Sequence, residues 1–173
     1  KAMLAQALST FAVRAAARLR REGLVASGLA VHIRTARPGQ AAANERLYDQ
    51  TVQCSLPVPT ADSQQFINAA LNGLERIFAP GFAYAKAGVM LYGLERADAM
   101  QGSLLALAAG NDACGDGRRQ RLMRSLDDIN GRFGRDTVIF GAQGMGHAPW
   151  HMRQEHRSPR MTTCWDEIPL VRC

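Results

Sequence analysis

The stretch Leu29-Ala30-Val31-His32-Ile33-Arg34-Thr35 alternates between apolar and polar side chains. Leu29, Val31 and Ile33 fall on one side of an extended chain, and His32 and Arg34 fall on the other. A period of two is typical of a β-strand with one face buried and the other open to solvent. Residues 29–35 therefore predict a strand that has a core on one side and a polar surface on the other.

The flanking sequence predicts the elements that pack around this strand. Residues 2–22 repeat apolar side chains at helical spacing and stop at Gly23, whereas residues 37–43 form a loop around Pro38-Gly39. Residues 47–56 alternate again, and Asp62 begins an amphipathic helix that closes at Pro80-Gly81. A third strand is expected at 84–92. This order predicts an α+β fold, an antiparallel sheet with two helices packed on one face.

The remainder of the chain is predicted to be a linker and a small extension. Residues 97–118 lack periodicity and are rich in alanine, glycine, asparagine and aspartate. A short helix over 122–133, a strand over 137–142 and a tail with two tryptophans follow. The predicted organisation is a domain at 1–96, a flexible linker at 97–118 and an extension at 119–173.

Composition limits the class of protein. The 173 residues are 47% hydrophobic and carry a formal net charge of +6. No apolar run has the length of a membrane span, no leader is recognised, and the four cysteines form no CxxC pair. A cytoplasmic protein without membrane contact is expected. The positive excess fits a polyanionic partner, but an ordinary solvated basic helix explains the charge equally well.

No catalytic or metal site is predicted. The glycines at 141–146 lack the order of a dinucleotide fingerprint, and Pro149 blocks the helix that should follow. Pro149 also prevents His147 and His151 from sharing a helical face, so zinc binding with His156 or Cys164 is disfavoured. The carboxylates of Asp127 and Asp128 diverge as helix neighbours, which favours a solvated helix face. Neither a metal nor another cofactor is expected.

Two features predict binding instead. The open sheet face would carry His32, Arg34, Thr51, Gln53, Ser55 and Lys86, side chains that suit the phosphates of a duplex. A solvated face without a partner is the alternative. In the linker, Gln101 precedes Leu104 and Leu105, and an extended peptide of this kind could insert its leucines into a partner's pocket. An apolar island of chance composition is the competing interpretation.

Three blocks resemble one known family. Ala83 to Leu91 is similar to the last strand of the little-finger domain of UmuC-type Y-family translesion DNA polymerases, and residues 56–63 resemble its strand-to-helix junction. Residues 122–134 with 150–171 resemble the extension specific to that subfamily. Cys164 departs from the arginine usual there, which puts a phosphate contact at that position in doubt.

The resemblance implies a non-catalytic piece of a DNA polymerase V-like enzyme that serves lesion bypass in the SOS response. Magnesium would belong only to a catalytic domain that this chain lacks. The implied partners are primer-template DNA, the sliding clamp, a UmuD-like protein and RecA, at the bacterial nucleoid. The alternative is a pure protein-interaction module without DNA contact. The residues implied are, for DNA, His32, Arg34, Thr35, Gln53, Ser55 and Lys86; for the clamp, Gln101, Leu104 and Leu105; and in the extension, Trp150, Arg153, Arg160 and Trp165.

One departure from the family concerns the sheet. Little-finger domains begin with a strand before the first helix, whereas this sequence opens inside that helix. A missing strand would leave backbone hydrogen-bonding groups unpaired at a sheet edge. We therefore expect the strand at 137–142, or a second chain, to fill that position.

Overall fold

The predicted half-buried strand is the centre of the fold. A computed structural model describes residues 1–36, 47–99 and 113–145, together with residues 150, 158, 159, 162, 164 and 168. Its elements in chain order are α1 (Ala2–Glu22), β1 (Leu24–Thr35), β2 (Asp49–Thr60), α2 (Ser63–Ile77), β3 (Tyr84–Arg96), the 3₁₀ turn η1 (Ala97–Ala99), α4 (Ala113–Phe133) and the 3₁₀ turn η2 (Gly141–Gln143). No helix among the described residues has the length and apolar character needed to cross a membrane.

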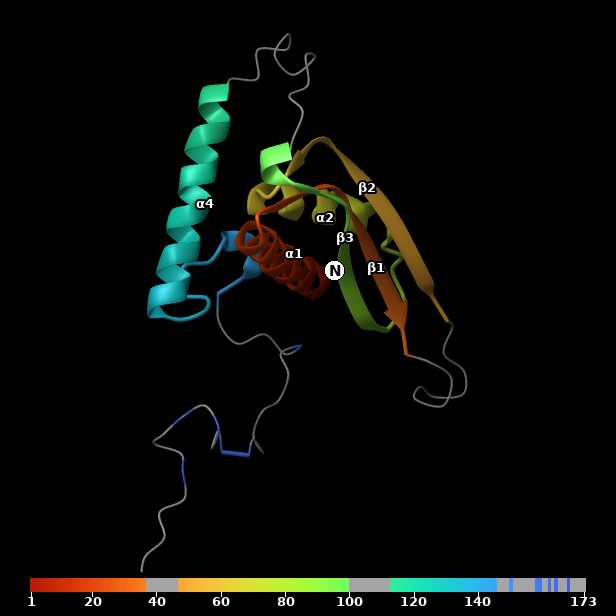
Figure 1. Ribbon diagram of the computed structural model, residues 1–173. Coiled ribbons are helices and arrows are strands. Elements are labelled where there is room, and N and C mark those ends of the chain that lie inside the picture. The colour runs from red at the N-terminus through yellow and green to blue at the C-terminus, as the bar shows by residue number, and fades with distance from the viewer. Residues whose placement is uncertain are drawn as a thin grey trace, which may run out of the picture.

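The sheet is antiparallel, with β1 between β2 and β3. Helices α1 and α2 cover one face, and α4 stands on the far side of α1 from the sheet (Figure 1). The core lies between the sheet and these two helices, where Leu29, Val31 and Ile33 of β1 are buried against Leu8 of α1 and Phe66 of α2. The predicted α+β arrangement is confirmed.

Local sequence signals set the helix ends. Gly23 ends α1 in the left-handed conformation with φ of 67°, and its N–H donates to the Arg20 carbonyl. Glycine adopts this conformation without the steric cost of a Cβ atom. Asp62 caps α2, because its carboxylate accepts a 2.8 Å hydrogen bond from the Gln64 N–H. Both ends agree with the sequence prediction.

Strand β2 runs four residues beyond its predicted end, to Thr60. The pairing register jumps there, from Gly28 opposite Ser55 to Ala26 opposite Thr60. Pro57 and Pro59 lie inside this irregular stretch. Proline is tolerated because β2 is an edge strand whose outer N–H groups need no partner in the sheet.

The C-terminal part differs from its prediction. Helix α4 begins at Ala113, inside the segment predicted to be a linker. Residues 137–142 form no strand, because the Asn130 side chain takes the place of a strand partner. Its amide donates to the Val138 carbonyl and its oxygen accepts from the Val138 N–H, both at 2.9 Å. The segment then reaches α1 through η2, where Gly144 lies against Gln6.

The expectation that residues 137–142 complete the sheet is therefore wrong. Within the described residues the sheet has three strands, and these residues pack along α4 and α1 instead. A strand supplied by a second chain stays a prediction.

Gly93 provides a test of how tightly β3 is fitted to β1. It has φ of +61°, and a Cβ atom there would overlap the Ser27 hydroxyl. Gly81 has φ of +87° with open space around it. We expect Gly93→Ala to lower the free energy of unfolding by about 3 kcal/mol, and Gly81→Ala by about 1 kcal/mol, because only the first adds a clash to the backbone strain. Urea unfolding measures both, and equal losses would contradict the described packing.

Candidate nucleic-acid interface

The sheet face opposite α1 and α2 is built from residues that pair across the three strands. Side chains directly opposite each other in an antiparallel sheet project to the same side, with Cβ atoms about 5 Å apart. Four rows follow from the register, and each runs from β2 through β1 to β3. They are Asp49, Arg34 and Lys86; Thr51, His32 and Gly88; Gln53, Ala30 and Met90; and Ser55, Gly28 and Tyr92.

This register brings together five of the six predicted DNA contacts. Arg34 and Lys86 are direct neighbours across the β1–β3 pair, so their cationic groups lie on the same side of the sheet. Gln53, Ser55 and Lys86 are exposed, whereas His32 and Arg34 are half-buried because they belong to the central strand. The face therefore presents polar groups on both edge strands.

Thr35 does not lie on this surface. Its side chain projects to the same buried side of β1 as that of Ile33, and the residue is only 6% exposed. Its Oγ1 accepts a 3.0 Å hydrogen bond from the Tyr48 N–H, and its own N–H donates to the Tyr48 carbonyl. Thr35 therefore fixes the entry to β2, and its place among the predicted contacts is corrected.

Small residues leave the middle of the face shallow. Gly28 and Ala30 occupy β1, and the Tyr92 side chain crosses Gly28 so closely that a Cβ atom there would overlap the phenol. The Tyr92 hydroxyl lies 3.2 Å from Ser55 Oγ, so one side chain links both edge strands across the centre. Tyr92 was not predicted from the sequence, although continuing in steps of two from Lys86 along β3 would have found it.

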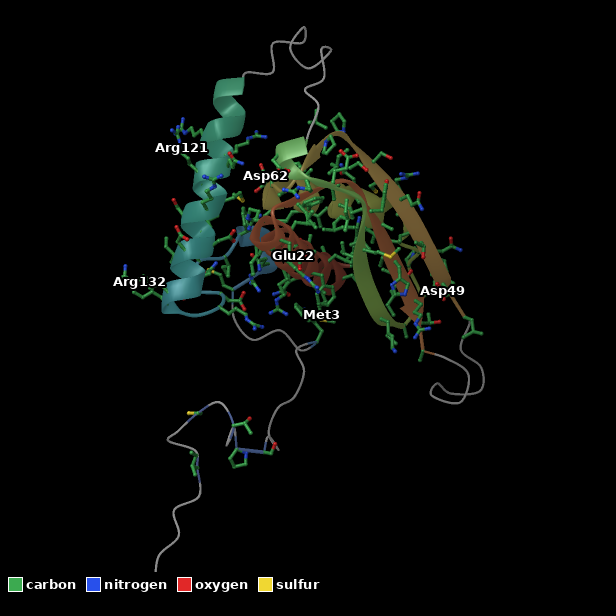
Figure 2. The ribbon with its side chains drawn as sticks, viewed as in Figure 1. Met3, Glu22, Asp49, Asp62, Arg121 and Arg132 are labelled. Atoms are coloured by element: carbon green, nitrogen blue, oxygen red, sulfur yellow. The ribbon has the colours of Figure 1, made fainter. Side chains whose placement is uncertain are left out.

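The charge on the face is small and uneven. Asp49 neighbours Arg34 on the β2 side, at the first residue of that strand (Figure 2). Neither Arg34 nor Lys86 forms an ion pair with any residue in the described part of the chain. Two cations against one carboxylate leave a net positive end, whereas Met90 and Tyr92 make the face more apolar farther along β3. Asp49, too, was not predicted from the sequence.

The other predicted contacts lie mostly beyond the described residues. Gln101, Leu104 and Leu105 fall outside them, as do Arg153, Arg160 and Trp165. The histidines at 147, 151 and 156 do too. Trp150 is described, and its ring meets Phe11 of α1 edge-on with 5.7 Å between centroids. Trp150 therefore anchors the extension on α1 by packing.

Asp127 is not merely part of a solvated helix face. Its two carboxylate oxygens accept from Arg20 Nε and Nη2 at 2.6 and 2.7 Å. Arg20 also donates to the Ala61 carbonyl and to Ser63 Oγ, so one guanidinium joins α1, α4 and the start of α2. No cluster of three or more possible metal-ligating side chains occurs among the residues that the structure places.

Comparison with known proteins identifies the family. The sequence pattern of the impB/mucB/samB family C-terminal domain matches residues 1–104 of this chain. This chain belongs to the impB/mucB/samB family. A second pattern, described as a domain of unknown function, matches residues 120–171. The two matches divide the chain into the sheet domain and the α4-containing extension.

Curated relatives support the same assignment over nearly the whole chain. Protein UmuC of Salmonella typhimurium is 34% identical over 167 residues, and Protein MucB of Escherichia coli is 36% identical over 166 residues. Each alignment covers 96% of this chain and 37% of the relative. The chain is a UmuC-type C-terminal region, as the resemblance in the sequence predicted. It spans little more than a third of the length of these relatives.

Proposed function

We propose that this impB/mucB/samB family chain is the non-catalytic C-terminal region of an error-prone translesion DNA polymerase and grips primer-template duplex with its open sheet face. The observation that supports this most is the pairing of Arg34 with Lys86 on a face that no described element covers. Three strands about 4.8 Å apart present a surface roughly 10 Å wide. This width suits a B-form major groove of about 12 Å.

The grip is proposed to be independent of sequence. Phosphate contacts position a protein on a duplex, whereas base contacts specify the sequence. In the middle of the face the central strand carries Gly28 and Ala30, which have no side-chain donors or acceptors with which to read bases, and its polar side chains His32 and Arg34 lie toward one end. The edge strands supply Thr51, Gln53 and Lys86, which can reach the two phosphate backbones beside the groove.

A fluorescence titration tests this proposal. Two phosphate contacts predict a slope of about −1.8 for the logarithm of affinity against the logarithm of salt concentration. Duplex affinity should then fall about tenfold between 50 and 200 mM salt, equally for two unrelated sequences. The result should be the same in EDTA, since no metal takes part. Absence of binding at low salt, or a flat salt dependence, would overturn the proposal.

The same protein is proposed to dock on the sliding clamp through Gln101, Leu104 and Leu105. It would act at the nucleoid during the SOS response beside a UmuD-like partner and RecA. Replacing both leucines by alanine should abolish capture by the clamp and leave duplex affinity unchanged. If the double variant is still captured, these residues are not the clamp contact.

A protein-interaction module is the second candidate, favoured by one specific observation. Met90 is 65% exposed on the same face as Tyr92. Exposed apolar side chains of this size suit a protein partner better than a phosphate backbone. Under this alternative, Met90→Ser would weaken partner capture, and duplex would not bind even at low salt.

A further inference from the structure

A second surface lies away from the open sheet face, between α4 and the α1 side of the domain. The cleft there has a volume of about 1120 Å³. Its lining comes from α1, the start of β1, the β2–α2 junction, α4 and the segment that returns from α4. The Arg20–Asp127 ion pair joins its two walls.

Apolar side chains from several elements line this cleft. Val13 comes from α1, Leu24 from β1, and Met123 and Leu126 from α4, with Val138 and Phe140 from the returning segment. Leu126 is half-buried and Val138 is 37% exposed, so both offer apolar surface, whereas Met123 is only 3% exposed and forms part of the wall. A ligand in this cleft would therefore bury apolar surface, which is the main source of affinity in such sites.

Charge is unbalanced around the same cleft. Six arginines and four aspartates line it, a net charge of +2. Arg14 and Arg20 are paired with Asp136 and Asp127, and Asp62 is occupied as the cap of α2. The remaining cations are Arg21, Arg119, Arg124 and Arg135, against Asp128 alone. None of these four arginines forms an ion pair within the part of the chain that the structure describes.

We propose that the cleft between α1 and α4 binds an acidic peptide segment of a partner protein that carries large apolar side chains on one face. Carboxylates of the peptide would meet the four arginines, while its apolar side chains would contact Leu126 and Val138. Amphipathic segments bind grooves in this way, with apolar anchors giving affinity and charge giving orientation. The proposal is independent of duplex binding at the sheet face.

A nucleic acid is the less suitable occupant. A duplex offers phosphates to the arginines but nothing that would bury the apolar lining, because its outer surface is charged throughout. An apolar floor with a cationic rim matches a ligand of mixed character. The volume also exceeds the roughly 300–1,000 Å³ of most small-molecule sites, which favours a peptide over a metabolite.

The test uses a fluorescein-labelled peptide of about 15 residues, in which leucine and phenylalanine recur every three or four positions among glutamates. Its anisotropy is titrated with the full chain. We expect Arg119→Glu with Arg124→Glu to weaken binding at least tenfold. Arg121→Glu with Arg132→Glu is the matched control, since these arginines belong to the same helix, do not line the cleft and point away from α1 (Figure 2). The control pair should change affinity less than twofold.

A further variant, a control peptide and a DNA competitor show which kind of molecule binds in the cleft. Leu126→Asp should abolish peptide binding, and a peptide with serine in place of every leucine and phenylalanine should not bind. Equal losses in the two arginine pairs, or unchanged binding of the serine peptide, would show nonspecific charge attraction and overturn the proposal. The cleft would be reassigned to nucleic acid if two results were found together. Duplex DNA would displace the peptide, and the binding of duplex itself would be weakened only in the Arg119/Arg124 variant. Thermal unfolding confirms that each variant is folded.

Discussion

Replacing Arg34 and Lys86 together by glutamate is expected to weaken duplex binding about 1,000-fold at low salt, or about 2 kcal/mol for each reversed charge. Each substitution turns an attraction to phosphate into a repulsion, and a screened charge pair at close range contributes about 1 kcal/mol. The slope of affinity against salt should also fall by about two, since two phosphate contacts are lost. Fluorescence titration at several salt concentrations measures both changes.

Two variants make this prediction specific to the sheet face. Arg121→Glu with Arg132→Glu applies the same charge change on the side of α4 that points away from α1 (Figure 2), and should leave affinity almost unchanged. Asp49→Asn removes the carboxylate beside Arg34 and should raise affinity, by roughly fivefold for about 1 kcal/mol of relieved repulsion. If the control pair on α4 weakened binding as much as the pair on the sheet face, only the total charge of the chain would matter.

Replacing Arg20 by alanine is expected to lower the free energy of unfolding by about 3 kcal/mol. The substitution removes a two-point ion pair with Asp127 and the hydrogen bonds to Ala61 and Ser63. The Arg20 side chain is only 12% exposed, so the Asp127 carboxylate would lose its partner in a partly desolvated place. Urea unfolding measures the loss, and hydrogen exchange should show faster opening of α4.

Arg18→Ala is the matched control for this prediction. Arg18 lies on the same helix and pairs with Glu22 one turn away, but both groups are largely exposed. Solvent and salt screen such a pair, so no measurable change in the unfolding midpoint is expected. If the Arg20 variant were as stable as the Arg18 variant, the guanidinium would not be what holds α4 to the domain.

The sheet and its two covering helices were predictable because their signals are local. Alternation in residues 29–35 indicated the buried and open sides of β1, and Gly23 and Asp62 indicated the helix ends. The same alternation places Thr35 on the buried side. It was the family resemblance that put Thr35 among the DNA contacts, and the local pattern was the better guide.

The extension was less predictable because its structure depends on distant contacts. The beginning of α4 was missed because residues 113–121 have no apolar period, although arginine and glutamine favour helices. The sequence around Val138 is typical of a strand. In the structure, however, the Asn130 side chain makes the hydrogen bonds to the Val138 backbone that a neighbouring strand would otherwise make. The partner of Asp127 is 107 residues away in sequence, and no spacing rule finds such a pair.

The most direct test of the sheet-face account is a ¹⁵N-labelled titration of the whole chain with a mixed-sequence duplex of about 16 base pairs, roughly one and a half turns. The amide signals of Arg34, Gln53 and Lys86 should shift together with those of their neighbours on all three strands. Signals from the outer surfaces of α1 and α2 should stay in place. Shifts confined to α4 or to the helical side, with the three strands unchanged, would contradict duplex binding by this face.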